Sequence, residues 1–265
     1  AKDGESIWNA AKRNNIHIPH LCHADEVGYD PDGNCRACVV QINNERTLAA
    51  SCVRKPTEGM EVNSISKDVK DTQKIIFELL AADQPSLESH PDPESKFWSW
   101  GKNLNINDKK FPKNKKIIRD ISHPSMHVNL EACINCNLCV RACREVQVND
   151  VIGFSGRGSD TKIVFDFDDK MGESTCVACG ECVQACPTGA LMPKTLVGNQ
   201  TVDKKVDSVC PFCGVGCLLT YKVKDEKIVA VDGRDGPANH NRLCVKGRFG
   251  FDYAHDKSRL TKPLI

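Results

Sequence analysis

The spacing of apolar positions along the chain predicts two helices in its first third. Ile7, Ala10 and Ala11 recur at helical intervals, and Pro19 is expected to prevent this helix from continuing. A longer helix is predicted for residues 69–83 (VKDTQKIIFELLAAD), where apolar and charged residues alternate with a helical period. We expect its apolar face to consist of Val69, Ile75, Ile76, Leu79 and Leu80.

Four other stretches carry apolar residues in the patterns of short strands. Residues 38–43 (CVVQIN) predict one strand, and residues 46–52 (RTLAASC) are able to pair with it. Residues 161–169 (TKIVFDFDD) predict another strand. Residues 218–236 (LLTYKVKDEKIVAVDGRDG) predict two strands that are joined by the polar turn DEK. The pattern therefore indicates short helices and short strands, without a long element that could organise one large core.

The composition indicates that the cores are small and need additional stabilisation. Apolar residues make up 40% of the 265 residues but aromatic residues only 6%, so each core is small and is expected to need a disulfide or a metal. The formal net charge of +1 argues against nucleic acid or an anionic membrane as the main partner. No apolar run approaches the length of a membrane span, and no signal peptide opens the chain.

The 16 cysteines are the strongest chemical signal in the sequence. They recur as C-x2-C units, which are typical of metal sites rather than of a secreted disulfide framework. Thiols that bind metals need a reducing compartment, so we expect the protein to be cytoplasmic. The cysteines form four sets of four along the chain.

The first set is Cys22, Cys35, Cys38 and Cys52, spaced C-x12-C-x2-C-x13-C. A long loop with three cysteines and one distant cysteine is how plant-type ferredoxins hold a [2Fe–2S] cluster, although their first gap is shorter. A zinc site is the alternative for this spacing. Three histidines lie close by, but we assign none of them as a ligand: His17, His20 and His23.

The second and third sets share the spacing C-x2-C-x2-C-x3-C, which is that of bacterial ferredoxins with two [4Fe–4S] clusters. In that arrangement the fourth cysteine of each run binds the other cluster. One cluster is therefore expected on Cys133, Cys136, Cys139 and Cys186. The second is expected on Cys176, Cys179, Cys182 and Cys143.

The fourth set is Cys210, Cys213, Cys217 and Cys244, spaced C-x2-C-x3-C-x26-C around the two predicted strands. Spacing alone allows either a zinc ribbon or a [4Fe–4S] cluster. The surrounding sequence favours the cluster. The segments VCPFCGVGCLL, GPANHNRLCVKGRFGFDYAH and RLTKPLI resemble the N-terminal [4Fe–4S] domain of molybdopterin oxidoreductases, especially of formate dehydrogenase alpha subunits.

The resemblance extends over nearly the whole chain. The order of the motifs is similar to the N-terminal third of a cytoplasmic, NAD-dependent type of formate dehydrogenase alpha subunit, in a form that lacks the cluster held by one histidine and three cysteines. It implies an α+β, multi-domain iron–sulfur protein. The expected parts are a β-grasp [2Fe–2S] ferredoxin at 1–68, a helical connector at 69–122, a two-[4Fe–4S] bacterial-type ferredoxin at 123–202 and a small β-rich [4Fe–4S] domain at 203–265. Both ends are expected to be truncated relative to the family.

The resemblance also implies a function. The chain would carry one [2Fe–2S] and three [4Fe–4S] clusters and relay electrons from formate oxidation at a molybdenum or tungsten bis-pterin guanine dinucleotide cofactor, which lies in a catalytic part beyond residue 265. Lys246, in the segment CVKG, matches the family lysine between cluster and pterin. No catalytic residue is expected in this chain, which would not turn over formate alone. The implied partner is a flavin- and NAD-binding diaphorase-type subunit in a hetero-oligomer.

Three alternatives remain open. The large iron–sulfur subunit of complex I has a similar first domain and last motif, and hydrogenase-associated subunits share the first two modules. A zinc- or cluster-stabilised interaction protein without a redox role is the alternative from another class.

A stretch of 80 residues without cysteine separates the first set from the second. In complex I's large subunit this region carries another [4Fe–4S] cluster, whose motif begins with His-Pro and continues with three cysteines. Residues 89–100 (SHPDPESKFWSW) keep His90 and Pro91 but have no cysteine, and Glu94, Ser95 and Lys96 stand near the first missing ligands. We therefore predict no cluster here and expect aromatic residues to fill the space: Phe97, Trp98 and Trp100. This absence favours a formate dehydrogenase over complex I.

Overall fold

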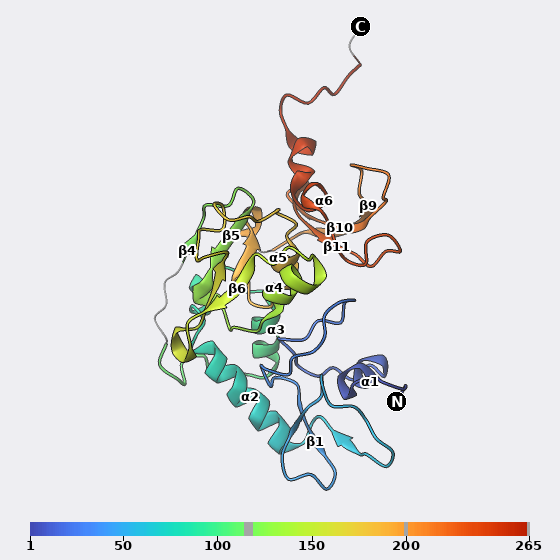
Figure 1. Cartoon of the computed structure of the whole chain (residues 1–265), viewed down its shortest axis with the longest axis vertical. Helices are drawn as coiled ribbons and strands as arrows, with labels where there is room; N and C mark the ends of the chain where they lie inside the picture. Colours follow the sequence, from blue (N-terminus) through green and yellow to red (C-terminus); the bar gives the residue numbers. More distant parts are fainter. Residues whose placement is uncertain (114–118, 199–200, 264–265) are drawn as a thin grey trace. The chain divides into compact units, whose positions relative to one another are not determined.

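The computed structural model describes residues 1–113, 119–198 and 201–263 (Figure 1). Residues 114–118 of the predicted connector, 199–200 of the predicted ferredoxin domain and 264–265 of the last domain lie outside the described residues. The chain divides into two compact units, each built from several segments. The first unit is Ala1–Ile118, Asn129–Leu138 and Pro187–Ala190, and the second is Arg119–Val128, Cys139–Cys186 and Leu191–Ile265. The boundaries of the four predicted domains stay predictions.

The first unit begins with the helix α1 (Ile7–Arg13). The Ser6 side chain caps it by accepting a hydrogen bond from the Asn9 amide (3.1 Å), which satisfies one of the free N–H groups of the first turn. The predicted helix is therefore present. It ends at Asn14, well before Pro19, so the proline does not terminate it as expected.

Three short strands form the sheet of the first unit, in the order β2-β1-β3. The central strand β1 (Val39–Ile42) pairs antiparallel with β2 (Ala49–Ala50) and with β3 (Val62–Asn63). The predicted pairing of residues 38–43 with 46–52 is thus confirmed. Helix α1 and this sheet share one core, which includes two cysteines of the first set: Ile7, Trp8, Ile18, Cys38, Val40, Ile42, Ala50 and Cys52.

Helix α2 (Lys67–Ala81) confirms the longer predicted helix but buries another face. Its buried row runs through Val69, Gln73, Phe77 and Ala81, four residues apart, together with Glu78. The buried Gln73 amide donates to the Val39 carbonyl of β1 (3.1 Å), which fixes this row against the sheet. The predicted face was therefore wrong at two positions, because Ile75 is 40% and Leu79 51% exposed.

The aromatic residues of the cysteine-free stretch lie on helix α3 (Lys96–Asn103), which follows the 3-10 turn η1 (Leu87–Ser89). Phe97 and Trp98 are buried, and Trp100 packs against the same core from the side. The rings of Phe77 and Phe97 stack with their centroids 5.5 Å apart, which joins α2 to α3. The predicted packing of these aromatic side chains is confirmed. The core consists of Leu21, Ala37, Phe77, Ala81, Phe97 and Trp98.

The second unit contains a small sheet, a hairpin and short helices around two cysteine runs. The strands β4 (Arg119–Asp120), β5 (Met126–Asn129) and β8 (Leu191–Pro193) form one sheet, in that order. The hairpin of β6 (Ile152–Ser155) and β7 (Lys162–Phe165) confirms the strand predicted at 161–169. The helical elements of this unit are α4 (Leu138–Arg141), which begins at the last residue of a first-unit segment, the π-helix η3 (Ala142–Val146), η4 (Gly158–Asp160), α5 (Glu181–Ala185) and η5 (Lys194–Leu196). The 3-10 turn η2 (Leu130–Ala132) belongs to the first unit.

The C-terminal part of the second unit is a three-stranded antiparallel sheet in the order β11-β10-β9. It comprises β9 (Lys204–Val209), β10 (Leu218–Lys224) and β11 (Lys227–Gly233). As predicted, β10 and β11 form a hairpin, and Asp225 and Glu226 adopt the positive φ values (49° and 59°) that a tight hairpin turn requires. Helix α6 (Val245–Phe249) and the turn η6 (Gly250–His255) follow.

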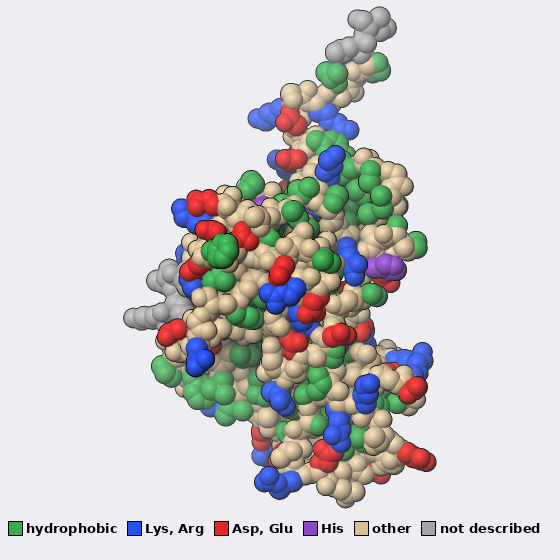
Figure 2. Space-filling view, in the orientation of Figure 1, with side chains coloured by type: hydrophobic (Ala, Val, Ile, Leu, Met, Phe, Trp, Pro, Cys, Tyr) green, Lys and Arg blue, Asp and Glu red, His purple; other side chains and the backbone are tan. Residues whose placement is uncertain are grey.

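The surface agrees with the balanced composition. Figure 2 shows acidic and basic side chains interspersed on the visible face, in keeping with 36 basic and 35 acidic residues in the chain. Within the described residues, no helix combines the length and the apolar character that crossing a membrane requires.

Candidate metal centres

All sixteen cysteines are free thiols, and most of them are buried or half-buried. Within residues 1–113, 119–198 and 201–263, no three His, Cys, Asp or Glu side chains gather around one point closely enough to hold a single metal ion. The thiolates of an iron–sulfur cluster bind different iron atoms, so such a site does not converge on one point. Whether the cysteines could hold such a cluster therefore depends on which sulfur atoms interact electrostatically and on which N–H groups donate hydrogen bonds to them.

The first set lies in the first unit, in the loop before β1 and directly after β2. The amide of Cys22 donates to the sulfur of Cys35 (3.4 Å), and the amide of Cys35 donates to the sulfur of Cys22 (3.5 Å). Backbone donors of this kind stabilise negative charge on sulfur and are one of the means by which proteins adjust iron–sulfur clusters. The strands hold Cys38 and Cys52 in the core.

The four thiols of the first set also act on one another electrostatically. The hydrogen bond between Cys22 and Cys35 lowers the pKa of Cys35 to about 6, and that between Cys38 and Cys52 lowers the pKa of Cys38 to about 7. The pKa of Cys52 is raised by its bond to Cys38, by burial and by the charges of Cys38, Cys22 and Cys35. Each thiolate is thus stabilised by a proton on its neighbour. An iron cluster supplies positive charge to all four thiolates, so the donor set fits the expected [2Fe–2S] group.

The neighbouring histidines pack around Trp8. The ring centroids of His20 and His23 lie 4.5 and 4.6 Å from that of Trp8, both edge-on. Burial, and next the charge of Lys96, lower the pKa of His20 to about 3, so this ring is neutral. The His20 Nδ1 atom donates to the Ile18 carbonyl (3.1 Å). His20 therefore has a packing role in the structure, in line with its not being assigned as a ligand.

The expected cluster site on Cys133, Cys136, Cys139 and Cys186 is divided between the two units, because the first two cysteines belong to the first unit and the last two to the second. This ligand set stays a prediction. Within the first unit, the loop that carries Cys133 and Cys136 contains a hydrogen bond to a cysteine sulfur. The Asn135 amide donates to the sulfur of Cys133 (3.4 Å).

Two side-chain amides join the loop of the first set to the loop of the second, within the first unit. The Asn34 amide donates to the Cys136 carbonyl (3.4 Å), and the Asn137 amide donates to the Asp32 carboxylate (2.8 Å). Residues more than 100 positions apart in the sequence are thereby in contact. The sequence did not indicate which ferredoxin loop the [2Fe–2S] loop touches, and the structure shows that it is the one with Cys133 and Cys136.

The second unit brings together the four cysteines expected on the other ferredoxin cluster. Burial, and next the charges of Cys179, Cys176 and Cys143, raise the pKa of Cys182. Burial likewise raises the pKa of Cys179, and the charges of Cys143 and Cys176 raise it further. Cys143, which is far from the other three in sequence, therefore lies among them, and its sulfur accepts a hydrogen bond from the Val151 amide (3.3 Å).

The fourth set surrounds the base of the C-terminal sheet and the start of α6. The Cys210 amide donates to the Cys217 carbonyl (2.8 Å), and Cys244 is the residue that precedes α6. Burial, and then the charges of Cys210, Cys213 and Cys244, raise the pKa of Cys217, so all four sulfur atoms lie near one another. Lys246 is exposed on α6, two residues after Cys244.

Arg248 is a buried arginine whose structural role the sequence did not reveal. It lies on α6, is only 1% exposed and connects three other segments of the second unit. Its Nε atom donates to the Cys179 carbonyl (3.3 Å), Nη1 to the Val231 carbonyl of β11 (3.1 Å) and to the Gln184 side chain, and Nη2 to the buried Glu181 carboxylate (3.3 Å). One guanidinium therefore links the loop with Cys176 to Cys182 to the helix that starts at Cys244.

Gly180 permits this close approach. It has a φ of +71°, and a Cβ atom there would lie 2.7 Å from the Cγ of Arg248 and 2.9 Å from the ring of Phe249. Both the conformation and the lack of space require glycine. The backbone of the third cysteine loop at Gly180 consequently packs directly against the Arg248 and Phe249 side chains of α6.

The structure gives His90 a complete set of protein partners. The Asp92 amide donates to its Nδ1 atom (3.0 Å), which leaves the proton on Nε2 to be donated to the Gln84 side chain (2.9 Å). Gln84 in turn donates to the Ala132 carbonyl (2.9 Å). Burial lowers the pKa of His90 to about 4, so the ring is neutral. Both ring nitrogens are thus engaged in hydrogen bonds with the protein, and the absence of a cluster here stays a prediction.

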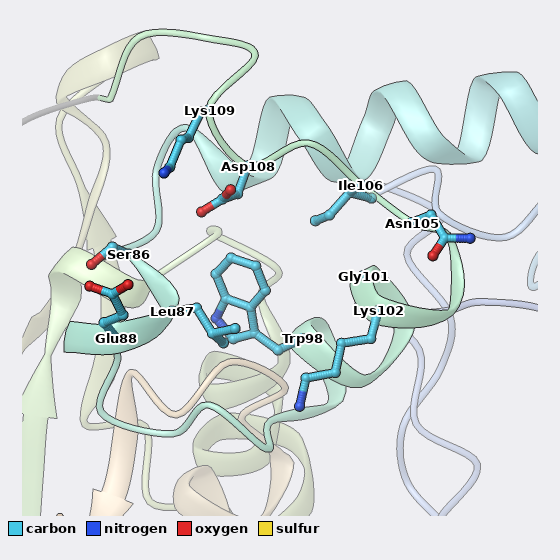
Figure 3. A pocket seen from close by; sticks show the side chains of 10 residues that line it. All are labelled: Ser86, Leu87, Glu88, Trp98, Gly101, Lys102, Asn105, Ile106, Asp108 and Lys109. Carbon is cyan, nitrogen blue, oxygen red and sulfur yellow. The ribbon is translucent and has the colours of Figure 1, made fainter.

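A pocket of about 620 Å³ opens beside this region (Figure 3). Figure 3 shows the Trp98 ring between Leu87 and Ile106, with acidic and basic side chains at the edge. The pocket lining includes the basic residues Lys102 and Lys109 and the acidic residues Glu88 and Asp108. The pocket has no cysteine or histidine in its lining.

Three sequence families match successive parts of the chain. The 2Fe-2S iron-sulfur cluster binding domain matches residues 1–67, the 4Fe-4S dicluster domain residues 132–190 and the molybdopterin oxidoreductase Fe4S4 domain residues 203–256. The chain is therefore an α+β, multi-domain iron–sulfur protein with these three domains.

Several curated proteins are similar over almost the whole chain. The probable oxidoreductase YjgC of Bacillus subtilis is 28% identical over 100% of this chain, and a subunit of an NADH-quinone oxidoreductase of Rhizobium meliloti is 30% identical over 99%. A putative formate dehydrogenase of Staphylococcus aureus is 26% identical over 99%. The chain spans about a third (31%) of the length of each of these relatives.

A solved structure, that of an NAD⁺-reducing [NiFe]-hydrogenase in the H2-reduced state, superposes with a TM-score of 0.67 and 25% identity, over 77% of this chain and 87% of that chain. The chain is thus homologous to iron–sulfur regions of oxidoreductases. It is about equally distant from formate dehydrogenase, quinone oxidoreductase and hydrogenase relatives, so the absence of the extra cluster does not by itself identify a formate dehydrogenase.

Proposed function

We propose that this chain is the electron-transfer portion of a formate dehydrogenase alpha subunit, which carries electrons between a molybdenum- or tungsten-pterin centre and a flavin- and NAD-binding partner. The observation that carries the proposal is the arrangement in the second unit. Two cysteine sets are joined there by the buried Arg248; in one, burial and then the charges of the other three members raise the pKa of Cys182, and in the other they raise the pKa of Cys217. Electron carriers must lie close together, and this contact joins the segments that would hold two of the clusters.

The residues that would hold the clusters are the four cysteine sets, with Cys143 and Cys186 exchanged between the two ferredoxin runs. Bound clusters would supply one-electron transfer. The protein's own contribution is to shield the sulfur atoms and to aim N–H groups at them, as the amides of Ala178 and Val151 do at Cys176 (3.4 Å) and Cys143 (3.3 Å). Such hydrogen bonds favour the more reduced and more negative state.

Lys246 is proposed to lie between the last cluster and the pterin of the complete enzyme. Its exposure on α6 beside Cys244 supports this position, since a partner group can approach it from solvent. An ammonium group there would hydrogen-bond an anionic group on the pterin side and reduce the cost of moving an electron past it.

The proposed partners rest on the names of the similar proteins. The names of two relatives, an NADH-quinone oxidoreductase subunit and an NAD⁺-reducing hydrogenase, support a flavin- and NAD-binding partner in a cytoplasmic hetero-oligomer. The name of the Staphylococcus aureus relative supports formate as the electron source. The large subunit of a quinone oxidoreductase is the second candidate, and the 30% identity to the Rhizobium meliloti protein supports it.

Metal analysis of protein purified without oxygen tests the redox proposal. One [2Fe–2S] and three [4Fe–4S] clusters predict about 14 iron atoms per chain, with matching acid-labile sulfide and no stoichiometric zinc. A colourless protein with four zinc ions would instead establish the interaction-protein alternative. Reduction of the clusters by formate in the presence of the native catalytic part would support a formate dehydrogenase, and failure of formate to reduce them there would favour the quinone oxidoreductase.

A further inference from the structure

The cysteine-free stretch places a cation where the expected motif would have a thiolate. Lys96 is the first residue of α3, and its ammonium group donates a hydrogen bond to the carbonyl of His23 (3.4 Å), the residue that follows Cys22. This contact spans 73 residues of sequence within the first unit. The lysine therefore reaches from the aromatic core of α3 to the loop of the first cysteine set.

The negative groups around Lys96 identify what it faces. Burial lowers the pKa of Lys96 to about 8, while the charges of Glu26, Cys35, Cys136 and Cys22 act in the opposite direction. Three of these four are cysteines, and two belong to the set expected on the [2Fe–2S] cluster. Because Asn34 bonds to the Cys136 carbonyl, the loops that carry these cysteines are in contact within the same unit.

A half-buried cation next to a redox centre has a definite physical effect. Reduction adds one electron to the cluster, breaks no bond and requires no proton, so the reduced cluster is more negative by one charge. A fixed positive charge stabilises this state more than the oxidised one, and the half-buried location limits screening by salt. Cluster potentials depend on net charge and hydrogen bonding in this way.

We propose that Lys96 sets the reduction potential of the [2Fe–2S] cluster, by holding a positive charge beside Cys22 and Cys35. The proposal rests on the proposed function, since it requires that these cysteines hold that cluster. Lys96 is a positioning and electrostatic residue, and it binds no iron. Its hydrogen bond to the His23 carbonyl directs its ammonium group at the cysteine loop.

The test is a redox titration of the [2Fe–2S] signal by electron paramagnetic resonance, on the cluster-loaded chain and its Lys96→Gln variant. At a fixed potential near the midpoint, we expect the ratio of reduced to oxidised cluster to fall about tenfold in the variant, which corresponds to about 59 mV for one electron. Lys96→Arg should stay near the original potential. Lys102→Gln is the matched control, because Lys102 lies on the same helix but is exposed and paired with Glu94.

The outcomes are distinct. Equal potentials in Lys96→Gln, Lys102→Gln and the original chain, with full iron content, would overturn the role of Lys96 and leave the proposed function intact. Absence of any [2Fe–2S] signal in the original chain would instead refute the proposed function. If Lys96→Gln does not assemble the cluster, Glu26→Gln decides, since it removes an exposed negative charge near Lys96 and should shift the potential upward. An unchanged potential there would also count against the proposal.

Discussion

Arg248 allows the sharpest test of how the second unit is held together. Replacing it with alanine leaves the Glu181 carboxylate, which is 3% exposed, without its cation. Removing one partner of a buried ion pair costs about 3–5 kcal/mol, because the remaining charge is left uncompensated. The carbonyls of Cys179 and Val231 lose a donor as well, each at about 1 kcal/mol when it stays buried. We therefore expect Arg248→Ala to lower the free energy of unfolding by about 5–7 kcal/mol.

The assay is denaturant unfolding of the cluster-loaded chain without oxygen, followed by the visible absorption of the clusters and by circular dichroism. Arg144→Ala is the control, because the ion pair of Arg144 with Asp150 is exposed on both sides and should contribute no more than about 1 kcal/mol. Arg248→Lys should be nearly as damaging as alanine, since an ammonium group cannot reach all four acceptors.

A double variant separates the ion pair from the other bonds. Arg248→Met combined with Glu181→Leu removes both charges, and it should recover part of the stability lost in Arg248→Met alone. If Arg248→Ala costs less than about 1 kcal/mol, the guanidinium does not hold the two segments together, and the packing described above is wrong.

Three further predictions concern other parts of the chain. Because burial lowers the pKa of His90 from 6.5 to about 4, the unfolded chain takes up a proton below pH 6.5 that the folded chain does not accept, so His90 alone lowers the stability by about 2 kcal/mol at pH 5. Burial lowers the pKa of His20 as well, so urea titrations at pH 7 and 5 should still show a loss in His90→Gln, but one smaller by about 2 kcal/mol than in the original chain. Gly180→Ala should destabilise by about 2–3 kcal/mol, from its left-handed φ and the contact with Arg248, whereas Gly59→Ala, at a similar φ in open space, should cost only about 1 kcal/mol in the same unfolding assay. Lys246→Ala should slow electron transfer from formate to an artificial acceptor in the complete enzyme and leave the iron content unchanged; an unchanged rate would refute the role given to Lys246.

The sequence predicts the features that depend on local spacing. The hairpin of β10 and β11 and the pairing of β1 with β2 follow from intervals of a few residues, and the structure contains both, whereas the four cysteine ligand sets stay predictions. The grouping of Cys143 with Cys176 to Cys182 required more, namely the rule that ferredoxin runs exchange their fourth cysteine.

What the sequence could not predict depends on packing partners far away in the chain. On α2, Ile75 and Leu79 are as apolar as Phe77, so hydrophobicity alone could not show that the row with the polar Gln73 is the buried one. The choice is made by the Val39 carbonyl of β1, which needs a donor. The burial of Arg248 could not be predicted either, because its partners are far away in the sequence and an arginine is normally a surface residue.

The discontinuous first unit has a consequence for biosynthesis. Its sheet and helices are encoded before residue 119, but it also includes residues 129–138 and 187–190, where the Phe97 amide donates to the Pro187 carbonyl (2.9 Å) and the Asn129 amide to the Ala190 carbonyl (2.7 Å). A chain emerging from the ribosome cannot complete these contacts until both later segments have been made. The segments of this unit that are synthesised earlier are therefore completed only by later ones, and insertion of iron into the cysteine loop has to wait for, or proceed without, the segments that close it.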